Sequence, residues 1–173
     1  MHLFVDGRIF KKAIGGIRVA TENIVCELAS NSNIKLSCFN VQKHQLSPHL
    51  QSILTVSSVE NIDKQSVVWS PNHKVSRLIP AHIPVVLTVH DLVWKVVPET
   101  MRWKTLLGEK LFFPYSVKRA NHIVCVSKNT QKDLHRYFPS TRNKSSVVYQ
   151  AASDFFYSCA TFGKEICAIR RHI

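Results

Sequence analysis

Short runs of β-branched and apolar residues alternate with segments of helical periodicity along this chain. The predicted strands cover residues 3–5, 34–39, 67–69, 85–89, 123–126 and 147–149. The run at 85–89 is apolar almost throughout and follows Pro84, which is typical of a central strand covered on both faces. The alternation predicts βαβ units, and therefore an α/β fold with a parallel sheet flanked by helices.

The helical segments in the first half of the chain differ in clarity. A helix is predicted over residues 17–29 because three apolar residues and a threonine repeat on one face. These residues are Ile17, Thr21, Ile24 and Leu28. Residues 42–65 are polar with scattered apolar side chains, which predicts a loop with one short helix near 49–54.

A second helical region covers residues 100–120, and its apolar residues stand in phase. They are Trp103, Leu106, Leu107, Leu111 and Val117. Pro114 has no backbone N–H, so we expect it to kink this helix or to begin another one. Ser127 is a favoured N-cap residue and predicts a further helix that ends at Pro139. Residues 151–173 show no clear period.

The size and charge of the chain limit its class. A chain of 173 residues is long enough for one compact domain and short for two. Hydrophobic residues make up 45% and charged residues 20%, which excludes a disordered chain. The net charge is +12, and residues 101–144 alone hold ten Lys or Arg against two carboxylates. Such a surface favours phosphate groups on lipids, nucleic acids or sugar nucleotides.

The cysteines and the N-terminus indicate a cytoplasmic protein. The five cysteines are odd in number and lack the two-residue spacing of zinc or thioredoxin motifs, so we expect reduced thiols and no metal site. The first residues contain no basic segment followed by a long apolar stretch, so no secretory signal is expected. The longest apolar region, 83–97, is broken by Pro84, His90, Asp91 and Lys95 and falls short of the roughly 18 apolar residues of a membrane-spanning helix.

Gly15 and Gly16 are candidate phosphate-binding residues. Neither G-x-x-x-x-G-K-[ST] nor G-x-G-x-x-G occurs among the five glycines, which excludes a P-loop NTPase. The two glycines stand between a predicted strand and a predicted helix, where bare backbone and a helix N-terminus can approach an anion. The alternative is an ordinary flexible turn.

His90 and Asp91 directly follow the most strand-like run of the chain. In a parallel sheet they lie at the carboxyl end of that strand, where open α/β sheets bind ligands. His90 can donate to a substrate hydroxyl or stabilise developing charge, while Asp91 can orient it or cap the next turn. The other eight histidines are interpreted as surface or packing residues.

Basic residues surround the apolar stripe of residues 100–120. They include Arg102, Lys104, Lys110, Lys118 and Arg119. A basic amphipathic helix of this type can lie on an anionic bilayer, and the alternative is a solvated face on a core-packed helix. Binding to nucleic acid is not expected, because no recognised motif accompanies the charge.

Four motifs resemble the N-terminal domain of glycosyltransferase family 4. Residues 86–99 read V-L-T-V-H-D-L-V-W-K-V-V-P-E, and residues 120–134 read A-N-H-I-V-C-V-S-K-N-T-Q-K-D-L. The early segments D-G-R at 6–8, G-G-I at 15–17 and T-E-N at 21–23 are similar to the opening of that family, and W-S-P at 69–71 suits its third strand. The resemblance extends over roughly residues 1–150.

The resemblance implies one half of a two-domain, B-type glycosyltransferase, with Rossmann-like domains facing each other across a cleft. Family members transfer a hexose, often mannose or glucose, from a sugar nucleotide to a glycan or lipid-linked acceptor, with retention and usually without a metal or other cofactor. By this resemblance, Gly15 and Gly16 approach the donor diphosphate and His90 faces the donor sugar as the catalytic residue. Ser127 lies at the edge of the cleft, as does Asp91 by its position after the strand.

The resemblance also sets domain expectations. Residues 1–152 are expected to form the acceptor-side domain and 153–173 an irregular tail, with the donor-binding C-terminal domain absent. The leading interpretation is a truncated transferase domain that is inactive as this short chain. One alternative is a non-catalytic module that binds a partner protein or an anionic membrane, on its inner face. Another is one subunit of a split glycosyltransferase, whose C-terminal domain is a separate chain. Departures from the family pattern at Ala20, Asn121, and 150–151 weaken inference about the acceptor.

Overall fold

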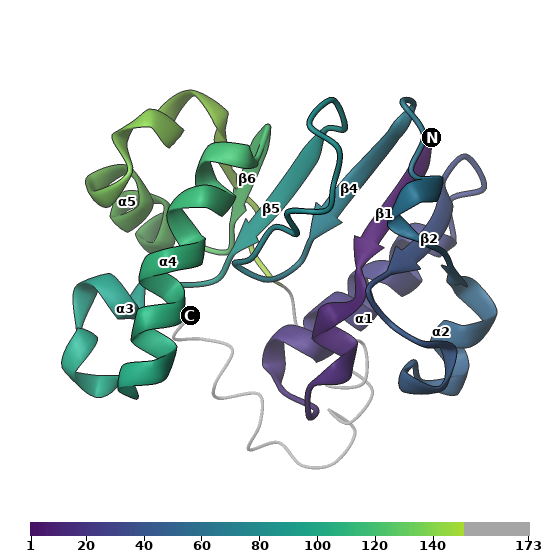
Figure 1. Ribbon diagram of the computed structural model, residues 1–173, viewed down its shortest axis with the longest axis horizontal. Coiled ribbons are helices and arrows are strands. Elements are labelled where there is room, and N and C mark those ends of the chain that lie inside the picture. The colour runs from purple at the N-terminus through teal and green to yellow at the C-terminus, as the bar shows by residue number, and fades with distance from the viewer. Residues whose placement is uncertain (151–173) are drawn as a thin grey trace, which may run out of the picture.

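The computed structural model describes residues 1–150 and shows an α/β domain built on a single sheet (Figure 1). All seven strands are parallel and stand in the order β3-β2-β1-β4-β5-β6-β7. Their bounds are β1 His2–Asp6, β2 Lys35–Phe39, β3 Thr55–Val56, β4 Ser66–Ser70, β5 Val85–Val89, β6 His122–Cys125 and β7 Ser145–Val147. The predicted α/β, Rossmann-like parallel sheet is confirmed.

Five α-helices and five short 3-10 helices connect the strands within residues 1–150. The α-helices are α1 Gly16–Ala29, α2 Pro48–Ile53, α3 Val93–Val96, α4 Trp103–Arg119 and α5 Lys128–Tyr137. The 3-10 helices are η1 Gly7–Lys11, η2 Lys43–Gln45, η3 Val59–Asn61, η4 Pro98–Thr100 and η5 Pro139–Lys144. The expected tail of 153–173 lies outside the described residues.

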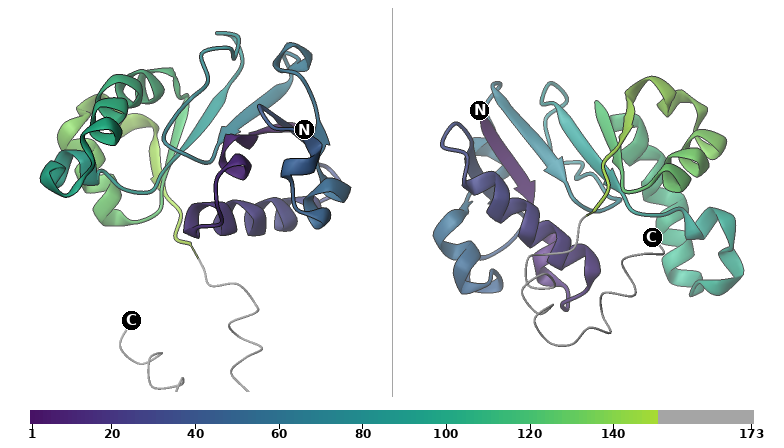
Figure 2. Two further views of the ribbon diagram at one scale, coloured as in Figure 1. Left: turned by 60° about the horizontal axis from the view of Figure 1, so that its bottom comes forward. Right: turned by 180° about the vertical axis from the view of Figure 1, so that it is seen from behind.

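The two faces of the sheet carry separate cores. On one face, side chains of β1 and β2 pack with Val25 of α1 and Leu50 of α2. On the other face, β5 and β6 pack with Phe113 of α4 and Leu134 of α5. The two groups of helices are separated in Figures 1 and 2. This division follows from right-handed crossovers that run outward in both directions from the middle of the sheet.

The run at 85–89 forms β5, which pairs with β4 on one side and β6 on the other. Val85, Leu87 and Val89 are fully buried on the face toward α4. On the opposite face the hydroxyl of Thr88 accepts a hydrogen bond from the indole of Trp69 at 2.9 Å. The prediction of an interior strand is therefore confirmed, and this strand fixes the position of the residues that follow it.

Three local predictions differ from the structure. The last strand lies at Ser145–Val147 rather than 147–149, and the short β3 forms within the predicted loop of 42–65. α4 continues through Pro114 from Trp103 to Arg119, so the alternative that Pro114 begins another helix is wrong. Pro114 is exposed, so the backbone carbonyl that loses its partner can reach water.

The apolar residues predicted in phase on α4 do not form a single face packed on the core. Leu106 and Val117 contact the core, but Trp103, Leu107 and Leu111 are exposed. The rotation of the helix is set instead by Phe113, which is fully buried. The stripe therefore straddles the boundary between the core and the surface.

Candidate functional site

The carboxyl ends of the strands meet at one edge of the sheet. The strand order reverses between β1 and β4, and open α/β sheets bind ligands outside the carboxyl ends at such a switch point. The loop after β1 leads to Gly15 and Gly16, and the loops after β4 and β5 contain His73 and His90. The topology thus brings the two glycines and His90 to the same edge, as expected from the sequence.

His90 is held on both its ring and its backbone. Its Nε2 lies 2.8 Å from the carbonyl oxygen of Pro71, which can only accept, so this nitrogen carries the proton and donates it. The backbone N–H of His90 donates to Nε2 of His73 at 3.0 Å, and its carbonyl accepts from the hydroxyl of Thr130 at 3.0 Å. The remaining ring nitrogen, Nδ1, lies 3.5 Å from the side-chain amide of Gln150. Nδ1 is therefore the ring atom available to a ligand.

His73 accepts a hydrogen bond, so its Nε2 is unprotonated. The ring stacks on that of His90, with centroids 5.8 Å apart, and meets Phe113 edge-on at the same distance. Burial is the main cause that lowers the pKa of His73 to about 4; His90 and Lys74 act in the same direction, and Asp91 opposes them. A neutral imidazole thus holds the backbone of His90 at physiological pH.

The loop that carries Pro71 and His73 is anchored from two sides. The carbonyl of Lys74 accepts hydrogen bonds from the hydroxyl of Ser70 at 2.9 Å and from the guanidinium of Arg8. The ammonium of Lys74 pairs with Glu109 of α4 at 3.3 Å. These contacts join the loop to β4, η1 and α4, and so they fix the position of the loop that binds His90.

Arg8 links the first strand to this loop through Asp6. The carboxylate of Asp6 is fully buried at the end of β1 and binds Arg8 through two nitrogens, with Nε at 2.9 Å from Oδ1. Asp6 also accepts from the backbone N–H of Arg8 at 3.2 Å, which caps η1. Bidentate pairing of this type fixes geometry as well as charge.

Gly15 and Gly16 lie at the N-terminus of α1, and nothing in the described structure requires them to be glycine. The φ of Gly15 is −156°, which any residue adopts, and a Cβ at either position would meet nothing within 4 Å. Gly7 is different, because a Cβ there would collide with Val41. Open space over bare backbone at a helix N-terminus can admit an anion closely.

The side chains of Asp91 and Ser127 both accept hydrogen bonds from backbone N–H groups at the starts of helices. The carboxylate of Asp91 is exposed and accepts from the N–H of Val93 at 3.2 Å, at the start of α3. The hydroxyl of Ser127 accepts from the N–H of Thr130 at 3.0 Å, which confirms the predicted N-cap of α5. Both lie after strands at the carboxyl edge, beside His90.

The four basic residues expected at an anionic surface differ in their contacts. Arg102, Lys104 and Lys118 are exposed. Arg119 instead donates to the carbonyls of Pro80 and Ile83, both at 2.7 Å, which ties the end of α4 to the segment before β5.

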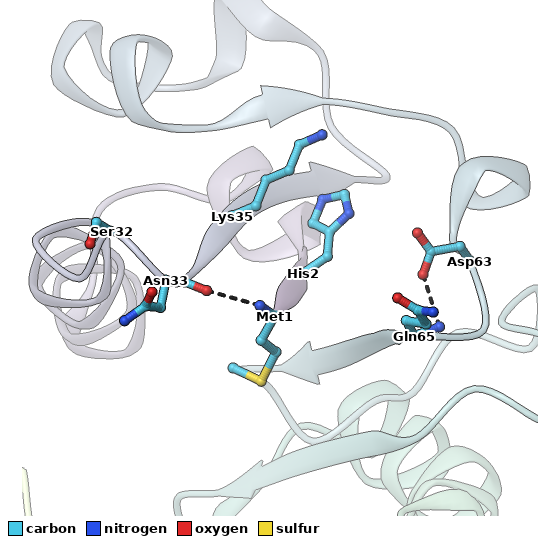
Figure 3. Close-up of a pocket in the computed structure, with 7 residues that line it drawn as sticks. All are labelled: Met1, His2, Ser32, Asn33, Lys35, Asp63 and Gln65. Carbon is cyan, nitrogen blue, oxygen red and sulfur yellow. Dashed lines mark hydrogen bonds between the residues drawn. The ribbon is translucent and has the colours of Figure 1, made fainter.

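A separate cavity of about 340 Å³ lies at the opposite, amino edge of the sheet (Figure 3). It is lined by Met1, His2, Ser32, Asn33, Lys35, Asp63 and Gln65. The N-terminal amine donates to the carbonyl of Asn33 at 2.8 Å, and Asp63 accepts from the backbone of Gln65 at 2.9 Å. These groups satisfy one another, and the cavity has no contact with His90.

The described residues contain no group of three or more His, Cys, Asp or Glu side chains that could hold a metal ion. Across residues 1–150, no helix combines the length and the apolar character needed to cross a membrane. Cys26, Cys38 and Cys125 are free, and burial raises the pKa of Cys38 and of Cys125 to about 11. Both thiols are therefore protonated and unreactive at neutral pH.

The sequence interpretation missed two residues that hold His90. The sequence predicts only a surface or packing role for His73, and it predicts no role for Thr130. A signal for His73 does exist, since it lies three residues after the strand that neighbours β5, at the same edge. No sequence pattern marks Thr130, whose contact with His90 spans 40 residues.

The fold and this edge define an α/β domain of the kind that B-type glycosyltransferases pair across a cleft. Residues 66–152, half of the chain, match the family profile of Glycosyltransferase Family 4. The chain belongs to glycosyltransferase family 4. The match includes His90 and Ser127, whereas the motifs before residue 66 remain a resemblance. No curated protein shows significant similarity to the chain.

Proposed function

We propose that this chain is the acceptor-side half of a retaining hexosyltransferase. The enzyme moves a hexose of the mannose or glucose type from a sugar nucleotide to a glycan or lipid-linked acceptor. The bond between the anomeric carbon and the diphosphate breaks, and an acceptor oxygen forms the new bond with the same anomeric configuration. Family membership supports the transferase over a non-catalytic module.

The position of His90 carries the proposal. His90 stands at the carboxyl end of β5, and its Nε2 is already bonded to Pro71 at 2.8 Å. This contact orients the ring and leaves the unprotonated Nδ1 to accept a hydrogen bond from a hydroxyl of the donor sugar. A group that is already oriented stabilises the transition state more strongly, because it does not have to rearrange during the reaction.

Gly15 and Gly16 supply the second part of the proposed donor site. Their open backbone at the N-terminus of the 14-residue helix α1 suits the departing diphosphate. The charged groups that complete diphosphate binding come, in this proposal, from a C-terminal domain on the facing side of the cleft. No metal ion is needed in this scheme.

The proposal is tested by combining the chain with a donor-binding domain of the same family and measuring transfer from UDP-glucose and GDP-mannose. We expect His90→Ala to lower kcat by about 10²-fold, the usual effect of removing a preorganised electrostatic contact. The anomeric configuration of the product, read by NMR, tests retention.

His82→Ala is the matched control, because His82 is an exposed histidine just before β5, at the opposite edge of the sheet. We expect this variant to keep wild-type kcat. Near-wild-type kcat in His90→Ala, with unchanged stability, contradicts the role assigned to His90. An inverted product contradicts the retaining mechanism.

A further inference from the structure

The outer face of α4 is apolar where a surface helix is normally polar. Trp103, Leu107 and Leu111 are exposed by 68%, 50% and 59%. Their spacing of four residues places them in one line along the helix. Single exposed apolar side chains need no explanation, but a continuous line of three large ones does.

The inner face of α4 is fully occupied, so the helix cannot turn this line inward. Phe113 and Val117 are buried in the core, and the hydroxyl of Ser116 accepts from the backbone N–H of Val75 at 2.9 Å. Glu109 pairs with Lys74 at 3.3 Å on the same inner side. The exposed line is therefore a fixed feature of the folded domain.

The charge around this line is positive. Lys104 and Lys118 each lie seven residues from Leu111, which places both on the outer face, and both are exposed. The only carboxylate within α4 is Glu109, which is 9% exposed and paired inward. Glu99 is an exposed carboxylate in η4, the segment before the helix, and the exposed Arg102 follows three residues later.

Exposed apolar side chains also occur in the segment that precedes α4. Val96 and Val97 are exposed. Trp94, which precedes them in the sequence, is buried and packs on Phe113 with ring centroids 5.4 Å apart. Figure 1 shows α3 beside the N-terminal end of α4. α3 begins three residues after His90. The N-terminal end of α4, beside α3, therefore lies near the edge of the sheet that carries the candidate site (Figure 1).

We propose that Trp103, Leu107 and Leu111, with Lys104 and Lys118, form a docking surface for an anionic lipid bilayer. The apolar line enters the interfacial region while the lysines meet anionic head groups, as in helices that lie in the plane of a membrane. A nucleic acid would use the lysines but leave the apolar line uncovered. The surface thus fits lipid by both its apolar and its charged parts.

The docking surface also bears on the acceptor, and this consequence rests on the proposed function. A domain docked through α4 brings the His90 edge close to the membrane, so the acceptor is lipid-linked rather than a soluble glycan. The docking itself is measured without any transfer reaction. Failure of docking and failure of the transferase proposal are therefore distinguishable.

Tryptophan fluorescence gives a direct test on the unaltered chain. Of the three tryptophans, Trp69 and Trp94 are buried and only Trp103 is exposed. We expect a blue shift when vesicles of phosphatidylcholine with about a third phosphatidylglycerol are added at low salt, and a weaker one at high salt. Pure phosphatidylcholine vesicles should give little change. Trp103→Phe should abolish the shift while vesicle sedimentation persists.

Two paired variants separate the apolar and the charged contributions. Leu107→Ser with Leu111→Ser should lower sedimentation with anionic vesicles by about tenfold or more. Lys104→Gln with Lys118→Gln should lower it by a similar factor at low salt and much less at high salt. The matched controls are Leu78→Ser, another exposed leucine, and Lys43→Gln with Lys64→Gln, which remove equal charge elsewhere.

Three results would overturn the proposal. The first is no blue shift and no sedimentation with anionic vesicles at low salt, a measurement that needs no variant. The second is equal binding to neutral and anionic vesicles. The third is a dimer in analytical ultracentrifugation that the leucine variants convert to monomer without any change in vesicle binding, because the line would then be covered by a second copy of the chain.

Discussion

At the scale of single residues, His90 depends on a partner that must stay neutral. His73 accepts from the backbone N–H of His90 at 3.0 Å, and it can do so only while its Nε2 lacks a proton. Burial favours that form by lowering the pKa of His73. The loop geometry at the candidate site and the protonation of His73 are therefore coupled.

We predict that His73 makes the domain less stable as the pH falls from about 6.5 to about 4. In the unfolded chain His73 takes up a proton near its ordinary pKa of 6.5, whereas in the folded chain it stays neutral down to about 4. The unfolded state thus binds more protons in this window, and the free energy of unfolding falls by up to about 3 kcal/mol. Urea denaturation at several pH values measures this loss.

The control for this prediction is His73→Gln, whose side-chain oxygen can accept the same hydrogen bond without titrating. As the pH falls from about 6.5 to about 4, the free energy of unfolding should decrease more for the wild type than for His73→Gln, because glutamine does not titrate. Parallel pH profiles for wild type and variant would show that His73 does not titrate as stated.

At the scale of elements, α4 and α5 are held at their ends by side-chain hydrogen bonds. Lys144 donates to the carbonyls of Val117 and Ala120, at 2.8 and 2.6 Å, and so satisfies the C-terminus of α4. Ser127 caps the N-terminus of α5 through Thr130, whose hydroxyl in turn donates to the carbonyl of His90. The start of α5 is thereby joined to the candidate site.

We predict that Ser127→Ala lowers the free energy of unfolding by about 1 kcal/mol, because the N–H of Thr130 loses its acceptor. Chemical denaturation measures the effect. Ser127→Asn should restore most of the stability, since asparagine also caps helices well. If both variants are equally unstable, or if neither differs from wild type, the cap is not what Ser127 contributes.

At the scale of the whole molecule, the proposed function assigns to the described residues one side of a donor site. The carboxyl edge offers the backbone of Gly15 and Gly16 and the ring of His90. Glycosyl transfer requires the donor to be held against the acceptor and the leaving diphosphate to be stabilised, which a single open edge does poorly.

We predict that a protein of these 173 residues alone shows no turnover and no saturable binding of sugar nucleotides. Isothermal titration calorimetry with UDP-glucose and GDP-mannose checks binding, and release of nucleoside diphosphate checks turnover. Both should appear when a donor-binding domain of the family is added. Robust transfer by the short chain, with contaminating enzymes excluded, would contradict the two-domain scheme.

The sequence by itself determined most of the elements and the edge at which the site lies. β-Branched runs and helical periodicity are local signals, so β5, α1 and α5 lie within a residue or two of their predicted ranges. The Ser127 cap was predictable because donor and acceptor are three residues apart. His90 was placed by topology alone, since parallel strands bring their carboxyl ends to one edge.

Only the tertiary structure decided which side of α4 faces the core. Helical periodicity groups Trp103 with Leu107, but Phe113 fills the space against β5 and Ser116 bonds to Val75, 41 residues earlier. Such contacts join segments that no local pattern relates, and the same holds for His73 with His90 and for Arg119 with Pro80. The free energy of packing in the assembled core therefore set the rotation of the helix and left its apolar line at the surface.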